Sequence, residues 1–131
     1  MLHEGECPCA AFPANQESEN LLVEYTKNYT RVVAELAASG RYDTKDDFTV
    51  VLQPYYRDFN PPRLNNGEVD LSFFAPDCFH PSAKAHAYAA TGLWNNMLEP
   101  VGKKTTTLTP GEHIKCPTKE SPFLFTNKNS N

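Results

Sequence analysis

The sequence lacks a long apolar run, an excess of basic residues and cysteine pairs spaced for zinc. Its longest apolar run is far shorter than the ~20 residues that an α-helix needs to cross a bilayer. The net charge is −4 and the lysines and arginines are scattered, so no basic stripe is present to neutralise phosphate groups. These absences exclude a membrane-spanning segment within these residues and argue against nucleic acid as a partner.

Signs of the cellular compartment are individually weak but agree with one another. Met1 to Glu4 lack the basic head and apolar run of a signal peptide,. The four cysteines are Cys7, Cys9, Cys78 and Cys116. The Cys7-Pro8-Cys9 spacing is too tight for a zinc pair and no second pair follows, so disulfides are the better interpretation. Asn28-Tyr29-Thr30 is a glycosylation sequon. Together these features favour an oxidising, extracytoplasmic compartment, and no metal or cofactor is expected.

Two helices are predicted from apolar spacing. The first runs from about Ser18 to Ser39, with Ser18 as its cap and Gly40 at its end. Its apolar residues recur at three- and four-residue intervals: Leu22, Tyr25, Tyr29, Val32, Val33 and Leu36. The second runs from about Ser82 to Leu98, capped by Ser82 and stopped by Pro100. Its expected buried stripe is Ala83, Ala87, Ala90, Trp94 and Met97.

One strand is predicted between the helices. Residues 48–53, Phe-Thr-Val-Val-Leu-Gln, are β-branched and apolar on consecutive positions, as in a strand covered on both faces. A long loop over 55–70 follows, and the chain from 101 onward has no periodicity. Helix, covered strand, loop and helix make half of an α/β unit. We therefore expect strands from upstream residues, or from a partner chain, to complete the sheet.

The run Asp77-Cys78-Phe79-His80 is the strongest candidate for chemistry. An aspartate three residues before a histidine, on a turn entering a helix, lets the carboxylate reach the ring Nδ1–H. The other ring nitrogen is then the base, as in a Ser-His-Asp triad. The pattern alone occurs often by chance, and a surface aspartate beside a helix-leading histidine is the simpler interpretation.

Several longer runs carry a resemblance. Residues 48–105 resemble the phospholipase B family, a branch of the GDSL or SGNH hydrolases. The matching runs are Val50 to Tyr56, Asp70 to Phe74, Asp77 to His80, Leu93 to Thr105, Lys115 to Pro117 and Glu120 to Leu124. The resemblance implies an α/β fold: the C-terminal part of a flavodoxin-like three-layer α/β/α sandwich with an incomplete sheet. Residues 1–105 are then the C-terminal part of an SGNH hydrolase domain, and residues 106–131 an irregular tail.

The resemblance also implies a function. A Ser-His-Asp triad would cleave acyl esters of phospholipids, with Asp77 orienting His80 as general base. The substrate is a phospholipid or another acyl-ester lipid, and the parent protein is extracellular or associated with the cell-surface membrane. The family's Gly-Asp-Ser, oxyanion-glycine and Gly-x-Asn-Asp blocks match nothing in this sequence. We therefore expect the chain to be inactive without the upstream half of the same domain.

Two other functions stay open: a non-catalytic extracellular glycoprotein that binds lipid or a partner, and an esterase acting on carbohydrate acetyl groups. Asp77 and His80 are called the dyad below. Beside them, the candidate substrate-binding residues are Tyr55, Tyr56 and Phe79, because ligands of open α/β sheets bind beyond the strands' carboxyl ends. Cys78 is expected to form a disulfide with Cys116 that pins the tail, while the partners of Cys7 and Cys9 stay open. His3, His86 and His113 are expected at the surface.

Overall fold

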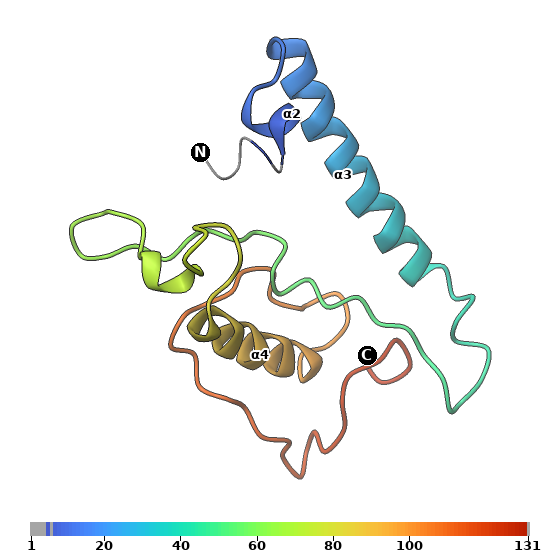
Figure 1. The fold of residues 1–131 in the computed structure, drawn as a ribbon. Coiled ribbons are helices and arrows are strands. Elements are labelled where there is room, and N and C mark those ends of the chain that lie inside the picture. The colour runs from blue at the N-terminus through green and yellow to red at the C-terminus, as the bar shows by residue number, and fades with distance from the viewer. Residues whose placement is uncertain (1–4, 6, 131) are drawn as a thin grey trace.

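The computed structural model describes residue 5 and residues 7–130, so His3 and the rest of Met1 to Glu4 lie outside the described residues. Its elements are α2 (Pro8–Ala11), α3 (Gln16–Ala38), a 3₁₀ helix η1 (Leu71–Phe73) and α4 (Ala83–Met97). Figure 1 shows α3 standing away from a body in which the C-terminal segment winds around α4. The described residues form two isolated β-bridges and no extended β-ladder.

The first predicted helix is present as α3, which begins two residues earlier than expected. Asn15 is its cap, because its extended backbone lets the side-chain oxygen accept a hydrogen bond from the Ser18 N–H at 2.8 Å. The prediction of Ser18 as cap was therefore wrong. The helix ends at Ala38, and Gly40 follows with a φ of +75°, a left-handed conformation suited to glycine,.

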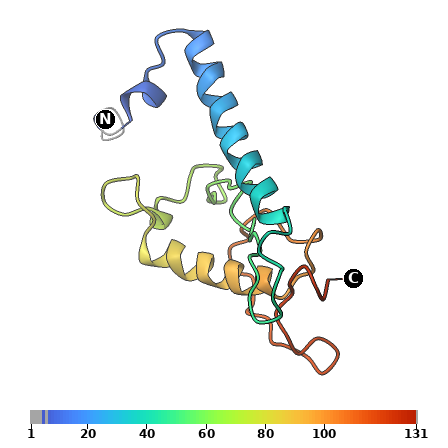
Figure 2. The same cartoon turned by 90° about the vertical axis from the view of Figure 1, so that its right-hand side faces the viewer.

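The apolar stripe of α3 is exposed except at Leu22, which is half-buried. No residue of α3 is buried, and Tyr25 and Tyr29 are 64% and 77% exposed. Figure 2 shows the same separation of α3 from α4 after a quarter turn. An amphipathic helix gains most of its stability from packing this face against another element. Along most of its length, α3 therefore presents a face built to be covered.

The predicted strand over residues 48–53 does not form. Within the described part of the chain, no backbone group of these residues pairs with the backbone of another segment. A strand exists only where a neighbour takes its hydrogen bonds, and the described residues supply none. The α/β sandwich is thus not present in this structure, which is mostly helix and irregular chain.

The second predicted helix is present as α4, with Ser82 as its cap; the Ser82 Oγ accepts from the Ala85 N–H at 3.3 Å. The expected buried stripe was wrong. Its alanines are exposed and Trp94 and Met97 are half-buried, whereas Gly92, Asn95 and Asn96 are buried. The buried face lies further round the helix, because the C-terminal segment covers it.

Residues 106–130 contain no helix or strand and are held to α4 by hydrogen bonds. The Trp94 indole N–H donates to the Lys115 carbonyl at 2.7 Å. The Asn95 side chain donates to the His113 carbonyl at 2.9 Å and accepts from the Lys115 N–H at 2.8 Å. These bonds satisfy a buried amide that would otherwise be costly. The tail is pinned by Asn95 and Trp94, without a disulfide.

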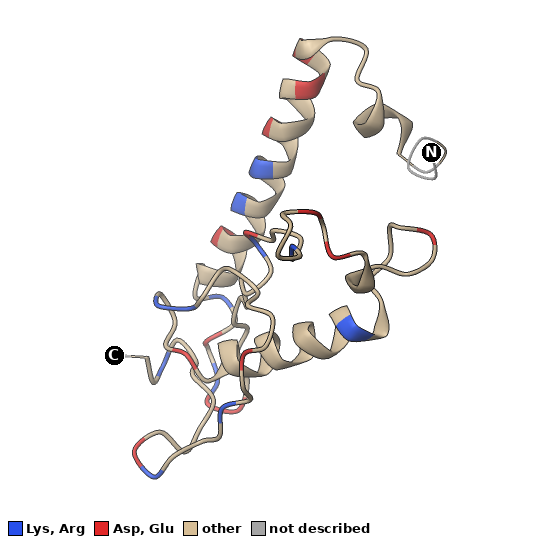
Figure 3. Ribbon diagram, turned by 90° about the vertical axis from the view of Figure 1, so that its left-hand side faces the viewer, with Lys and Arg blue, Asp and Glu red and all other residues tan. Residues whose placement is uncertain are grey.

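Charged residues are dispersed over the molecule, as Figure 3 shows, with neither sign gathered on one element. Among the helices that the structure describes, none is long and apolar enough to cross a membrane.

Candidate active site

Asp77 and His80 lie at the tip of a short hairpin that leads into α4. Near its base, the Ser82 N–H donates to the Phe73 carbonyl at 3.0 Å. Nearer the tip, the Ala75 N–H donates to the His80 carbonyl at 2.8 Å, and Phe74 and Pro81 form an isolated antiparallel bridge. Backbone hydrogen bonds between the two arms of the hairpin therefore close the turn that carries Asp77 and His80.

The Asp77 carboxylate binds three groups. Its Oδ2 lies 2.6 Å from Nδ1 of His80, and its Oδ1 accepts from the backbone N–H groups of Phe79 and His80, both at 3.0 Å. Cys78 has a φ of 59°, in the left-handed region, where non-glycine residues are uncommon. Such backbone strain is common at functional sites, where the surrounding structure maintains it. The geometry brings together the two residues that the motif predicted.

Electrostatics fix the state of this pair. The hydrogen bond with the His80 side chain, aided by the Phe79 and His80 N–H groups, lowers the pKa of Asp77 to about 2. The carboxylate is therefore ionised at neutral pH and favours the ring tautomer with hydrogen on Nδ1, which makes Nε2 the basic atom. The His80 side chain is 64% exposed, so the ring is accessible from outside the chain.

A small aromatic cavity of about 100 Å³ adjoins the dyad. Its lining residues are Tyr56, Phe59, Phe73, Phe74, Phe79, Pro81, Ala85 and Leu108. The Phe79 ring meets the His80 ring edge-on, with centroids 5.0 Å apart, and Tyr56 stacks on Phe59 at 4.6 Å. Two of the predicted substrate-binding residues, Tyr56 and Phe79, therefore share one cavity. Leu108, from the irregular tail, could not be predicted as a lining residue, because no periodicity marks that segment.

Tyr55, the third predicted substrate-binding residue, does not line this cavity. A Cβ added to Gly92 of α4 would lie 3.1 Å from its ring, so Tyr55 packs against that helix. Its ring centroid is 6.0 Å from that of Tyr56. Of two adjacent tyrosines, one faces the cavity and the other supports the packing behind it.

The four cysteines are exposed free thiols. The Cys78–Cys116 bridge is thus not formed in this structure, and the pairing stays a prediction. Asn28 is exposed on α3, so its sequon is accessible, and its glycosylation likewise stays a prediction. His86 and His113 are exposed, as predicted.

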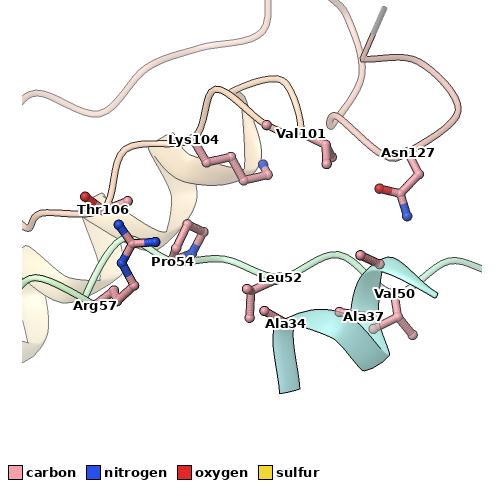
Figure 4. A pocket seen from close by; sticks show the side chains of 12 residues that line it. Ala34, Ala37, Val50, Leu52, Pro54, Arg57, Val101, Lys104, Thr106 and Asn127 are labelled. Atoms are coloured by element: carbon pink, nitrogen blue, oxygen red, sulfur yellow. The ribbon is translucent and has the colours of Figure 1, made fainter. Parts of the chain in front are cut away.

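A larger cavity, about 470 Å³, lies elsewhere, between α3, residues 50–54 and residues 101–106. Figure 4 shows Ala34 and Ala37 of α3 beside Leu52 and Val50, with Val101 and Lys104 across the opening. Its cations are already bound. Arg57 pairs with Asp58 at 3.1 Å, and Lys104 donates to the Asn96 and Glu99 carbonyls at 2.5 and 2.8 Å. The cavity is thus an apolar groove rather than an anion site.

Comparison with known proteins places the chain in a family. The GDSL-like lipase/acylhydrolase family model matches residues 1–93, and the chain belongs to this family. It is 51% identical over 128 residues to membrane-associated phospholipase B1 of Mus musculus, an alignment that covers 95% of this chain. It is 47% identical over 133 residues to the Homo sapiens protein of the same name, with 99% of this chain covered. The chain spans only 9% of the length of each relative. No solved structure gives a significant match.

These similarities confirm the resemblance drawn from the motifs. The oxyanion and nucleophile blocks stay absent from this sequence. The serines next to the dyad hairpin have other partners: Ser72 Oγ donates to Asp70 at 2.6 Å, and Ser82 Oγ donates to the Ser72 carbonyl at 2.7 Å.

Proposed function

We propose that this chain supplies the acid–base part of an enzyme that hydrolyses acyl esters of phospholipids. Asp77 orients the ring, His80 is the general base, and the serine nucleophile comes from residues outside this chain. The observation that carries the proposal is the 2.6 Å contact between Asp77 Oδ2 and His80 Nδ1. The relatives' name, phospholipase B1, supports the substrate class.

The mechanism follows from the dyad. As the serine oxygen attacks the acyl carbonyl, Nε2 of His80 takes the hydroxyl proton, and the ionised Asp77 stabilises the resulting imidazolium. The same nitrogen then donates the proton to the departing alcohol oxygen. Water repeats the sequence on the acyl-enzyme, which releases the fatty acid.

The aromatic cavity is suited to bind part of an acyl chain, which favours an acyl ester as the substrate. Phe79 lines it and also touches the His80 ring, so a chain bound there begins beside the base. With a volume of about 100 Å³, the cavity holds a few methylene groups, and the remainder of a fatty acyl chain extends beyond it. Tyr56 and Phe79 are the substrate-binding residues in this proposal, and Tyr55 is a support behind Tyr56.

In this proposal, the same upstream residues supply both the serine nucleophile and the strands that complete the sheet. The backbone of residues 48–53 has no ladder partner among the described residues, and no residue of α3 is buried. Strands from the upstream half of the domain pair with residues 48–53 and lie against α3. The product is the flavodoxin-like α/β/α sandwich, in which serine and oxyanion donors stand at the strand ends near His80.

An activity assay tests the proposal. For the assay, an extended polypeptide is made in which the residues that precede the matching segment of Mus musculus membrane-associated phospholipase B1 are joined ahead of this chain, to supply the serine that the proposal requires. It should release fatty acid from fluorescent phosphatidylcholine, whereas the 131-residue chain alone should release none. His80→Ala should abolish turnover, and His86→Ala, an exposed histidine on α4, should leave it unchanged. Turnover by the 131-residue chain, or full activity of His80→Ala, would falsify the proposal.

The second candidate is a non-catalytic glycoprotein of the extracellular space that binds lipid or a partner. The exposed apolar face of α3 and the accessible Asn28 sequon favour it. It requires that the 131-residue chain fold by itself and melt cooperatively, whereas a partial hydrolase domain melts gradually. Circular dichroism with size-exclusion chromatography separates the two. In either case the parent protein is extracellular or bound at the cell-surface membrane.

A further inference from the structure

Lys84, on the first turn of α4, joins that helix to η1. Its Nζ lies 2.6 Å from Ser72 Oγ and 3.1 Å from Asp70 Oδ2. The same ammonium stands over the Phe73 ring, 4.3 Å from its centroid. One cation therefore binds a hydroxyl, a carboxylate and an aromatic face on three residues of the segment that leads to the dyad.

The partner carboxylate is itself held in place. Asp70 Oδ1 accepts from both the N–H and the hydroxyl of Ser72, at 3.0 and 2.6 Å, and so caps η1. The Asp70 side chain is 19% exposed, much less than both members of the Arg31–Glu35 pair at 58% and 62%. The Lys84 side chain is 43% exposed, so the pair is shielded in part and is moderately stronger than a fully solvated pair.

This cluster continues into the dyad hairpin. The Ser82 hydroxyl donates to the Ser72 carbonyl at 2.7 Å, and the Ser82 N–H donates to the Phe73 carbonyl at 3.0 Å. From Phe73 the hairpin runs through Phe74 and Ala75 to the tip. Phe73 also stacks on Tyr88 of α4, with centroids 5.3 Å apart. The base of the hairpin is thus fixed to α4, and the dyad depends on that base for its position.

We infer that Lys84, through its contacts with Asp70 and Ser72, is a positioning residue for the Asp77–His80 dyad. The inference rests on the proposed hydrolase function. Lys84 does not touch the dyad. It holds η1 on the first turn of α4, so that the hairpin has one orientation and His80 meets the serine at one distance and angle. Misplacement of a catalytic group by about 1 Å costs on the order of a hundredfold in rate.

Kinetics of the extended polypeptide test the inference. Lys84→Met keeps the length of the side chain and removes its charge, so Asp70 and Ser72 lose their shared partner. We expect kcat on fluorescent phosphatidylcholine to fall on the order of tenfold to a hundredfold, with KM unchanged. Lys84→Arg should restore most of kcat. Lys103→Met is the matched control, because Lys103 is exposed and its side chain makes no hydrogen bond among the residues that the structure describes.

A spectroscopic measurement reports on the dyad directly. The Nδ1–H proton of His80 should give a downfield ¹H resonance that Lys84→Met broadens or removes and that Lys103→Met leaves in place. Asp70→Asn is a second variant, since its amide oxygen can still cap η1 while its charge is lost. It should weaken the resonance without unfolding the domain. This resonance is observed whether or not the polypeptide turns over substrate.

The outcomes separate the two proposals. A lowered melting temperature of Lys84→Met with unchanged kcat and an unchanged His80 resonance would make Lys84 merely structural and overturn the inference. An equal loss in Lys103→Met would do the same. An extended polypeptide whose turnover survives His80→Ala would instead refute the proposed function, and the resonance would still decide whether Lys84 positions the dyad.

Discussion

Gly92 of α4 lies directly against Leu108 of the tail: a Cβ atom added at Gly92 would stand 2.8 Å from Cδ1 of Leu108. Leu108 is one of the few buried apolar residues in the described chain, at 8% exposed. It also lines the aromatic cavity beside the dyad. A glycine inside a helix normally costs about 1 kcal/mol relative to alanine. Its presence here is explained by the close approach of the tail.

Gly92→Ala should therefore destabilise the protein despite its better helix propensity. Overpacking costs about 1–3 kcal/mol, so the propensity gain of about 1 kcal/mol leaves a net loss of up to about 2 kcal/mol. In a Leu108→Ala background the same change should cost less, because the nearer obstructing methyl is gone and only the Tyr55 ring, 3.1 Å from the added Cβ, remains. A double-mutant cycle in urea measures this coupling. Additive effects would mean that the two residues do not meet in solution.

The helices could be predicted because their signals are local. Apolar spacing, a capping serine at Ser82 and a following Pro100 all act within one or two turns. The cap of α3 was missed, because Asn15 and Ser18 are both good caps and only the backbone conformation chooses between them. The strand over residues 48–53 did not form for the opposite reason. Its sequence is suited to a sheet, but sheet pairing depends on residues distant in the chain.

The candidate site likewise combines features that local sequence determines with features that depend on distant residues. The Asp77–His80 contact could be predicted, because three residues on one turn determine it. Which of Tyr55 and Tyr56 faces the cavity could not, because it depends on how α4 and Leu108 pack. Lys84 was missed because its role appears only when η1 docks on α4.

The depressed pKa of Asp77 predicts its behaviour in acid. Since the folded-state pKa is about 2 and the ordinary value is 3.8, the ionised carboxylate contributes stability fully above pH 3.8. That contribution is lost as the pH falls through about 2. A ¹³C NMR titration of the Asp77 carboxyl group should have its midpoint near 2. In His80→Ala, which removes the largest cause of the shift, the midpoint should rise. A midpoint near 3.8 in the unmodified protein would contradict the 2.6 Å contact.

The Cys78–Cys116 disulfide is tested in protein secreted from eukaryotic cells. Both thiols are exposed, so oxidants can reach them, and a bond between them would tie the tail across the dyad turn. Non-reducing peptide mapping by mass spectrometry should find one peptide that joins the two cysteines. Cys116→Ser should then leave Cys78 open to alkylation. Free thiols at both positions in the secreted wild-type protein would disprove the pairing and leave the Asn95 hydrogen bonds as the tail's main tether.

The aromatic cavity predicts selectivity among esters. Phe79→Ala in the extended polypeptide removes a cavity wall that also touches the His80 ring. We expect kcat/KM for long-chain acyl esters to fall about tenfold, equivalent to ~1.4 kcal/mol of transition-state binding. An acetyl ester does not reach the cavity, so its kcat/KM should change little. Phe123→Ala is the control, because Phe123 is 73% exposed and lies outside the cavity. Equal losses on acetyl and long-chain esters would show that Phe79 acts on the His80 ring alone and that the acyl chain binds elsewhere.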